Sequence, residues 1–390
     1  MKINFSNTEV AFQLKSNAQL QKARLMFLSI SRPSIVKFLQ WAIKLCFKLH
    51  LPIKWIIKGT VFEHFCGGET IEECTTQVAA MYSKGVYSIL DYSVEGKHDE
   101  ADFERTKTMT MRTIEYAASN PGVPFSVFKP SGIGRHDLYV KVGKGEKLNP
   151  AETAEWNKVR ARYYEMAQLA FDKNIPLMVD AEEVSIQQAI DDLVAELMEK
   201  FNKEKAIVWN TAQLYRWDRL QHLKDAVAAA RQKGYFYGVK IVRGAYMERE
   251  RRYAKAGKYT DPIQPNKAAT DQGFNDAVTF LVENIDIASS MIATHNEASS
   301  QLVSNIMTNH NIDRKDKRIY VAQLFGMSDN LTFNMADAGH HVVKYLPFGP
   351  VQDVLPYLFR RAEENTSIAG QTSRELSLIN AELKRRRHQK

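Results

Sequence analysis

Short apolar runs alternate with longer amphipathic stretches along most of the chain. The runs are rich in β-branched and aromatic residues, which is typical of strands, and stretches such as IQQAIDDLVAELMEKFNKE repeat apolar residues at helical spacing. Strands that alternate with helices pair in parallel, because each crossover helix returns the chain to the same end of the sheet. The eight runs occupy residues 87–93, 125–129, 176–180, 206–210, 237–242, 290–294, 318–322 and 341–345.

Eight strand–helix units over about 280 residues fit an α/β fold of the closed (βα)8 type, a distorted TIM-like barrel. The alternative is an open doubly wound sheet, which is disfavoured because no G-x-G-x-x-G motif follows any run. We expect the last helix to lie over the active site. The pattern predicts three parts: an N-terminal helical region at 1–84, the (βα)8 domain at 85–375 and a basic C-terminal tail at 376–390.

Composition excludes several classes of protein. With 390 residues, 44% of them hydrophobic, the chain can bury a large core. Three cysteines argue against a disulfide framework and for a reducing compartment. No signal peptide and no apolar run of membrane-spanning length occurs, so we expect a cytoplasmic protein. We expect no metal site, because His64, Cys66 and Cys74 lack the spacing of zinc ligands.

The net charge of +8 is concentrated at the chain's two ends. Residues 1–50 carry eight Lys/Arg against the single acid Glu9, and the final seven residues, KRRRHQK, add five positive charges. A fold that binds nucleic acid should carry its basic patch within the folded domain, so we expect no nucleic-acid partner.

Segment 35–51 reads as a basic amphipathic helix. It either packs on the main body with its lysines in solvent or makes peripheral contact with an anionic membrane surface at the inner face. Its polar positions are Lys37, Gln40, Lys44 and Lys48, opposite Phe38, Leu39, Trp41, Leu45 and Phe47.

Polar side chains gather just after the apolar runs, where the chemistry of a (βα)8 barrel lies. Each has an ordinary structural explanation taken alone: Asp180 can cap a helix, and His295 can be a core histidine. Their shared position at one end of the predicted barrel points to a site. They are Lys129, Asp180, Glu182, Gln213, Arg243, Tyr246, His295, Gln323 and Tyr345, followed by Arg360, Arg361 and Glu364 in LPYLFRRAEEN.

These residue types suit a small amino acid as substrate. Arg360 and Arg361 can grip a carboxylate, with Glu364 orienting them from the next turn. Lys129 and Asp180 follow neighbouring strands, so they can form an ion pair or present a carboxylate to a substrate ammonium. A Schiff-base aldolase or lyase with Lys129 as nucleophile fits the same residues. The spacing alone does not decide between them.

The segments VDAEE, QLYRWD, GVKIVRGAYMERER, IATHN, QLFGMSD and KYLPFGPVQDVLPYLFRRAEEN occur in this order and resemble the proline dehydrogenase (proline oxidase) family. The resemblance covers roughly residues 85–370. It implies a flavoprotein that oxidises L-proline to Δ1-pyrroline-5-carboxylate, by hydride transfer from C5 to N5 of FAD, and passes the electrons to a membrane quinone. It also implies a monofunctional chain, so that a separate pyrroline-5-carboxylate dehydrogenase acts next on the way to glutamate.

The resemblance also assigns roles to residues. Arg360 and Arg361 would hold the proline carboxylate, with Glu364 fixing them. Lys129 and Asp180 would form an ion pair beside the substrate, and Tyr345 and Tyr357 would flank its ring. Lys240 departs from the arginine of some bifunctional relatives, which keeps the charge but not the bidentate hydrogen bonding. Residues similar to FAD-binding positions are Gln213, Lys240, Val242, Arg243, Gly244, Thr294, His295 and, more weakly, Gln323.

Overall fold

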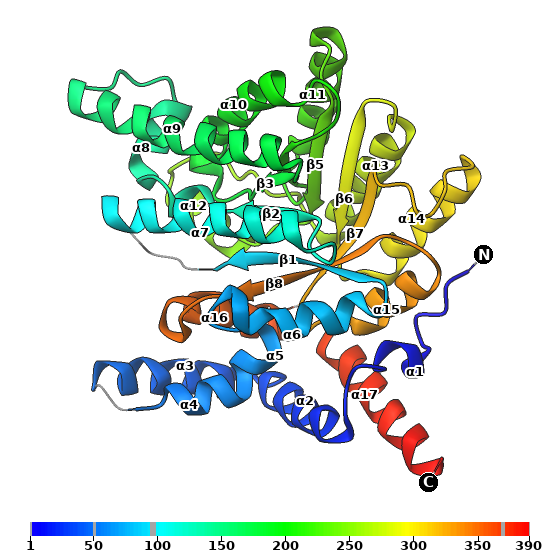
Figure 1. Cartoon of the computed structure of the whole chain (residues 1–390). Coiled ribbons are helices and arrows are strands. Elements are labelled where there is room, and N and C mark those ends of the chain that lie inside the picture. Colours follow the sequence, from blue (N-terminus) through cyan, green and yellow to red (C-terminus); the bar gives the residue numbers. More distant parts are fainter. Residues whose placement is uncertain (1, 50–51, 94–98, 368–370, 390) are drawn as a thin grey trace. The chain divides into compact units, whose positions relative to one another are not determined.

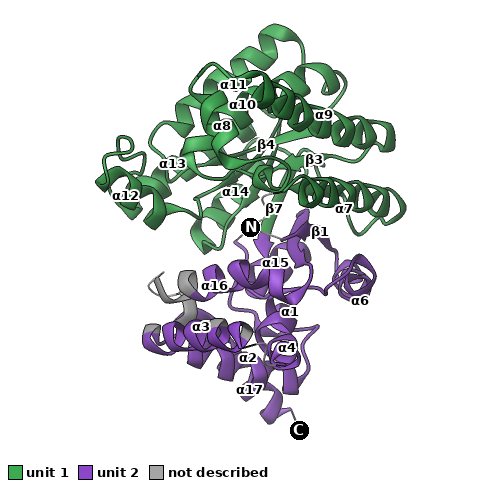
Figure 2. Cartoon of the chain, turned by 90° about the vertical axis from the view of Figure 1, so that its left-hand side faces the viewer, with its two compact units in different colours: residues 1, 96–322 green, residues 2–95, 323–390 purple. Residues whose placement is uncertain are grey.

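The computed structural model describes residues 2–49, 52–93, 99–367 and 371–389. The chain forms two compact units, one of residues 96–322 with residue 1 and one of residues 2–95 with 323–390 (Figure 2). We call them unit 1 and unit 2.

The eight strands form a closed barrel in chain order, which confirms the predicted (βα)8 fold (Figure 1). The neighbouring strands whose register is known pair in parallel, for example Asn210 with Val239. Every predicted run overlaps an observed strand. The strands are β1 (Val86–Tyr92), β2 (Phe125–Phe128), β3 (Leu177–Val179), β4 (Val208–Gln213), β5 (Tyr237–Val242), β6 (Ala288–Ala293), β7 (Ile319–Leu324) and β8 (Val342–Phe348).

In unit 1 the strands alternate with helices that have clear end signals. For α9, Asn149 and Glu152 form a reciprocal capping box and Pro150 occupies the first turn, where its missing N–H costs nothing. Gly234 ends α11 with a φ of +67°, which glycine adopts readily. The helices are α7 (Glu100–Ser119), α8 (His136–Gly143), α9 (Pro150–Lys173), α10 (Val184–Phe201), α11 (Arg219–Lys233), α12 (Met247–Lys255), α13 (Lys267–Glu283) and α14 (Glu297–Asn309), with a 3-10 turn at Pro130–Gly132.

Alternation along the strands decides which side chains are available for chemistry. On β5, Val239 and Ile241 are fully buried, and Lys240 points to the opposite face of the strand. Lys240 is itself buried, so its charge must be met by other groups of the protein.

Unit 2 contains the helices at both ends of the sequence together with β1 and β8, which pair from Val86 with Val342 to Tyr92 with Phe348. None of the helices in the described ranges is long and apolar enough to cross a membrane. The helices are α1 (Thr8–Ala11), α2 (Asn17–Ile30), α3 (Pro33–Lys48), α4 (Lys54–Ile57), a π-helical turn (Lys58–Phe62), α5 (Glu63–Phe65), α6 (Ile71–Tyr82), α15 (Asp329–Asp337), α16 (Val351–Ser367) and α17 (Gln371–His388).

The basic residues after 376 belong to α17, which packs into unit 2. Leu378, Ile379 and Leu383 are buried in one cluster with residues of α2 such as Phe27. Arg386 donates to the carbonyl oxygens of Phe12 and Lys15 and, with Arg385, bonds Glu382. Part of the terminal positive charge is therefore used within the fold. The two units also divide the chain differently from the three ranges expected at 1–84, 85–375 and 376–390.

Candidate active site

The central feature of unit 1 is a carboxylate held by two lysines. Asp180 directly follows β3, and Lys129 directly follows β2. The Nζ atom of Lys129 lies 3.4 Å from one carboxylate oxygen of Asp180, and Lys240 of β5 donates a short hydrogen bond to the other. The predicted contact between Lys129 and Asp180 is therefore present. Lys240 was not expected as a second partner of Asp180, because it comes from β5, which is not adjacent to β3 in the barrel.

All three side chains are largely buried, with 12%, 15% and 6% of the side chains of Lys129, Asp180 and Lys240 exposed. Burial alone would raise the pKa of Asp180, but the attraction of Lys240 and Lys129 outweighs it and lowers the pKa below the ordinary value of 3.8. The carboxylate is thus ionised at neutral pH, and the cluster carries one net positive charge.

Hydrogen-bond donors gather at the ends of β4, β5 and β6. The side-chain amide of Gln213 donates to the carbonyl oxygen of Glu182 at 2.7 Å. The guanidinium of Arg243 donates to Asp271 at 2.7 Å, to Thr294 at 2.7 Å and to Ser299 at 3.0 Å. These bonds use three of the five N–H groups of Arg243, which leaves hydrogens for further acceptors.

Other predicted residues lie close to these donors or in unit 2. His295 directly follows Thr294 and is partly exposed. The backbone N–H of Leu214 donates to the carbonyl oxygen of Val242 at 2.8 Å, which continues the pairing of β4 with β5. Gln323 belongs to unit 2, where it is buried and accepts a hydrogen bond of 2.9 Å from Thr332.

Gly244 requires glycine for two reasons. Its φ is +137°, and a Cβ atom there would lie 2.2 Å from the ring of Tyr215. The ring cannot move away easily, because Tyr215 is buried and its N–H donates to the carbonyl oxygen of Arg243 at 2.6 Å. The glycine lets the chain turn tightly past Tyr215 directly after Arg243.

We expect Gly244→Ala to lower the free energy of unfolding by about 2–3 kcal/mol, through backbone strain and overpacking. The matched control is Gly234→Ala, which has a φ of +67° and open space around its Cβ, and which should cost about 1 kcal/mol. Urea unfolding of both variants measures the difference. Equal losses would show that the contact with Tyr215 is relieved without cost.

The predicted substrate residues of unit 2 lie on α16 and β8. Tyr357 and Arg361 are buried, and the guanidinium carbon of Arg361 lies 5.2 Å from the centre of the Tyr357 ring. Arg360 is partly exposed, and Tyr345 is buried within β8. The backbone of Glu364 belongs to α16, but its side chain lies outside the described residues.

Sequence reasoning missed a buried charge cluster in unit 2. Lys344 of β8 is fully buried and bonds Asp329 at 2.9 Å and the carbonyl oxygen of Leu324 at 3.2 Å. Glu375 of α17 accepts a hydrogen bond of 2.6 Å from the backbone of Ser328. A lysine in the middle of an apolar strand, VVKYL, was the available signal.

Burial and the nearby charge of Asp329 raise the pKa of Glu375 from 4.5 to about 7, despite opposing effects of Ser328, Lys344 and Arg374. Because the folded protein binds this proton more tightly than the unfolded chain, stability falls as pH rises from about 4.5 to 7 and stays lower above that.

We therefore expect Glu375→Gln to stabilise the protein at pH 8, by up to roughly 3 kcal/mol, and to have little effect at pH 4.5. Urea unfolding at both pH values tests this, with Glu199→Gln in an exposed ion pair with Lys233 as the control. If the free energy of unfolding differs between Glu375→Gln and the parent by the same amount at both pH values, the raised pKa of Glu375 is contradicted.

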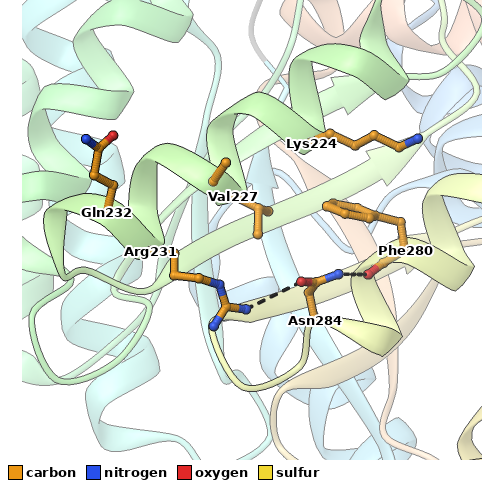
Figure 3. Close-up of a pocket in the computed structure, with 7 residues that line it drawn as sticks. Lys224, Val227, Arg231, Gln232, Phe280 and Asn284 are labelled. Atoms are coloured by element: carbon orange, nitrogen blue, oxygen red, sulfur yellow. Dashed lines mark hydrogen bonds between the residues drawn. The ribbon is translucent and has the colours of Figure 1, made fainter.

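A surface depression of about 390 Å³ lies between α11 and α13, and none of the predicted site residues lines it (Figure 3). Arg231 and Asn284 line it, near the carboxyl ends of the two helices, where the chain is about to enter β5 and β6. It therefore lies toward the amino ends of the strands, opposite the end that carries chemistry in such barrels.

Comparison with known proteins identifies the family to which the chain belongs. The family model for proline dehydrogenase matches residues 74–374. The chain is 35% identical to the carbapenem antibiotics biosynthesis protein CarD of Pectobacterium carotovorum over 83% of each chain. It is 38% identical to mitochondrial proline dehydrogenase 1 of Homo sapiens, over 81% of this chain and 54% of that protein.

Two further matches bear on substrate and fold. The hydroxyproline dehydrogenase of Xenopus laevis is 28% identical over 98% of this chain and 90% of its own length. The structure of proline utilization A from Bdellovibrio bacteriovorus aligns with a TM-score of 0.72 at 19% identity, over 92% of this chain and 38% of that one. This structural match supports the barrel fold. The family match and the sequence identities show that the chain belongs to the proline dehydrogenase family of oxidoreductases.

Proposed function

We propose that this protein oxidises L-proline to Δ1-pyrroline-5-carboxylate with FAD as cofactor, as the first step of proline breakdown to glutamate. The observation that carries the proposal is the Asp180 carboxylate between Lys129 and Lys240, at the strand ends of a barrel of this family. Three strands contribute to this cluster, so the barrel itself fixes its geometry.

The donors at the ends of β4, β5 and β6 fit a flavin cofactor. Gln213 offers an amide, Thr294 a hydroxyl, and Arg243 a cation with N–H groups to spare, which suits the diphosphate and the carbonyl oxygens of FAD. We assign Lys240, Val242, Gly244, His295 and Gln323 to the same cofactor. When bound, FAD would supply the electron sink, with its N5 as acceptor for the hydride lost from C5 of proline.

The protein's own residues select the reactive form of the substrate. Proline must react with its amine unprotonated, since only a nitrogen lone pair can form the C=N bond. The net positive charge of the Asp180 cluster disfavours a further ammonium ion nearby, and so favours the neutral amine of proline.

Orientation is the second task of the protein. Arg360 and Arg361 would bind the carboxylate of proline, with Glu364 orienting them, while Tyr345 and Tyr357 pack against the ring. Both tyrosines are buried, which suits contact with apolar ring carbons. No nucleophile of the protein is needed.

Anaerobic addition of L-proline to the purified holoprotein tests the proposed function. We expect the visible absorption of the flavin to bleach with L-proline and to stay unchanged with an equal concentration of D-proline. A flavin-loaded protein whose spectrum is unaffected by L-proline would overturn the proposal.

A Schiff-base reaction at Lys129 is the alternative with the same residues. A Schiff-base lysine must attack as a neutral amine, whereas the Asp180 carboxylate 3.4 Å away stabilises the ammonium form. The contact between Lys129 and Asp180 and the family match both favour proline oxidation over a Schiff-base reaction. Borohydride trapping of Lys129 with a carbonyl substrate would reverse this preference.

For the electron acceptor we propose a membrane quinone, with a separate pyrroline-5-carboxylate dehydrogenase consuming the product. Steady-state turnover with a soluble quinone analogue, compared with oxygen as acceptor, tests the first part. Faster turnover with oxygen would contradict it.

Tyr345 is expected to set the preference between proline and 4-hydroxyproline, a choice made relevant by the hydroxyproline dehydrogenase among the relatives. A phenol packed against C4 leaves no room for a hydroxyl, and such overpacking costs about 1–3 kcal/mol. We expect hydroxyproline to be poorer by roughly tenfold or more in kcat/KM. In Tyr345→Ser, proline turnover should fall and the hydroxyproline-to-proline ratio should rise, whereas Tyr345→Phe should keep the preference. An unchanged ratio in Tyr345→Ser would place the selectivity elsewhere.

A further inference from the structure

One face of helix α13 holds the guanidinium of Arg243, which directly follows β5. The helix packs against β5, β6 and α14 in unit 1 (Figure 1). Asp271 accepts a hydrogen bond of 2.7 Å from Nε of Arg243, and the centre of the buried Phe274 ring lies 4.4 Å from its Cζ carbon. Asn275 is the next residue along. Because the three residues are spaced i, i+3 and i+4, they share one side of the helix.

Asn275 acts on the same arginine through a hydroxyl. Ser299 donates its hydrogen to the side-chain oxygen of Asn275 at 2.7 Å. A hydroxyl has a single hydrogen, so Ser299 must then accept from Nη2 of Arg243, which lies 3.0 Å away. Thr294 accepts from Nη1 at 2.7 Å. All three nitrogens of the guanidinium therefore have a fixed partner, and two N–H groups remain for a ligand.

The charges around Arg243 leave an excess of one positive charge. Asp271 is bonded both to Arg243 and, through a short hydrogen bond, to Lys267 in the first turn of α13. Burial tends to raise the pKa of Asp271, but the bonds from Lys267 and Arg243 lower it below the ordinary value of 3.8. Two cations thus share one carboxylate at neutral pH. This balance keeps Arg243 paired and still favours an anionic ligand.

We propose that Asp271 is a positioning residue for the cofactor: together with Phe274 and Asn275, it holds Arg243 in the orientation that binds the diphosphate of FAD. A flexible arginine loses side-chain freedom when it binds a ligand, whereas three acceptors and a ring already fix this guanidinium in the folded protein. Asp271 therefore raises the affinity for FAD through Arg243. This inference rests on the proposed use of FAD.

Competition experiments on the full-length holoprotein test this role. ADP carries the diphosphate without the flavin ring, and riboflavin carries the ring without phosphate, so their dissociation constants report the two halves of the site separately. In Asp271→Ala we expect FAD and ADP to bind roughly tenfold more weakly and riboflavin to bind as in the parent. Asp271→Asn keeps an acceptor for Nε of Arg243 and should lose less. Equal losses for ADP and riboflavin would mean a general structural role and would overturn the proposal.

The matched control is Asp276→Ala on the same helix. Asp276 is exposed and accepts a hydrogen bond of 2.7 Å from Gln272, so its replacement should leave all three dissociation constants unchanged. If Asp271→Ala fails to fold, Asn275→Ala tests the same arrangement and should also weaken FAD and ADP but not riboflavin.

A double variant decides whether Asp271 acts through Arg243. In the Arg243→Met background, Asp271→Ala should cause no further loss of FAD affinity. A further loss of similar size would overturn the proposal. A parent protein that binds no FAD would overturn the proposed function and this inference with it. A parent that binds FAD with an affinity insensitive to Asp271→Ala would overturn the inference alone.

Discussion

Replacing Asp180 with asparagine is expected to lower the free energy of unfolding by about 3–5 kcal/mol, the usual cost of removing one partner from a buried ion pair. The variant leaves Lys129 and Lys240 close together with only a neutral amide between them, and both are largely buried. Coulomb repulsion between the two ammonium groups then adds to their lost pairing.

The matched control is Asp286→Asn, which breaks the exposed pair with Arg231 in the same unit. That pair is more than half exposed on both sides, so little change is expected. A double variant, Asp180→Asn with Lys240→Met, should recover part of the lost stability, because it removes one of the two facing charges. If Asp180→Asn costs no more than Asp286→Asn, the lysines do not depend on this carboxylate.

The pH dependence of the same variant provides a second test. Because the folded pKa of Asp180 lies below 3.8, its contribution to stability is present above that pH and is lost as pH falls through the folded value. The difference between Asp180→Asn and the parent should therefore be constant at neutral pH and narrow in strong acid. Urea unfolding at pH 7, 5 and 3 measures it.

The barrel fold could be predicted from the sequence, because the periodicities of strands and helices are local properties of the chain. Each short run, such as YGVKIV, shows its β-branched residues and its boundary without any knowledge of neighbours. The same reasoning placed Lys129 and Asp180 at adjacent strand ends, since parallel strands finish at one edge. Topology therefore places the two residues at neighbouring strand ends, where the structure shows them 3.4 Å apart.

Contacts between distant segments could not be read in this way. Nothing near Lys240 or Lys344 in sequence indicates their partners, Asp180 and Asp329, because pairing across a barrel depends on strand order and tilt. Helix α3 shows a related limit. Its periodicity reveals the apolar side chains, but not that Val36 is buried while Phe38 and Trp41 are 61% and 60% exposed. Residues 376–390 likewise read as a basic tail from their charge, and that charge does not reveal that the apolar side chains of α17 are buried against α2.

Replacing either arginine of the pair in α16 is expected to reduce kcat/KM for proline by about 30-fold to several thousandfold. This range corresponds to the roughly 2–5 kcal/mol lost when one member of a buried charge pair is truncated. The expectation rests on the proposed role of Arg360 and Arg361 in binding the substrate carboxylate.

The two variants should differ in a second measurement, which makes the test specific. Arg361 is buried over the ring of Tyr357, so Arg361→Ala should also lower Tm, whereas Arg360 is partly exposed and Arg360→Ala should lower Tm less. Arg360→Lys and Arg361→Lys keep the charge but lose the two-pronged geometry, so both should show intermediate kcat/KM. A carboxylate role predicts that the methyl ester of proline, which lacks the negative charge, is affected much less by these replacements than proline is. Equal losses for proline and its ester would instead mean that the arginines act only by supporting the fold of α16.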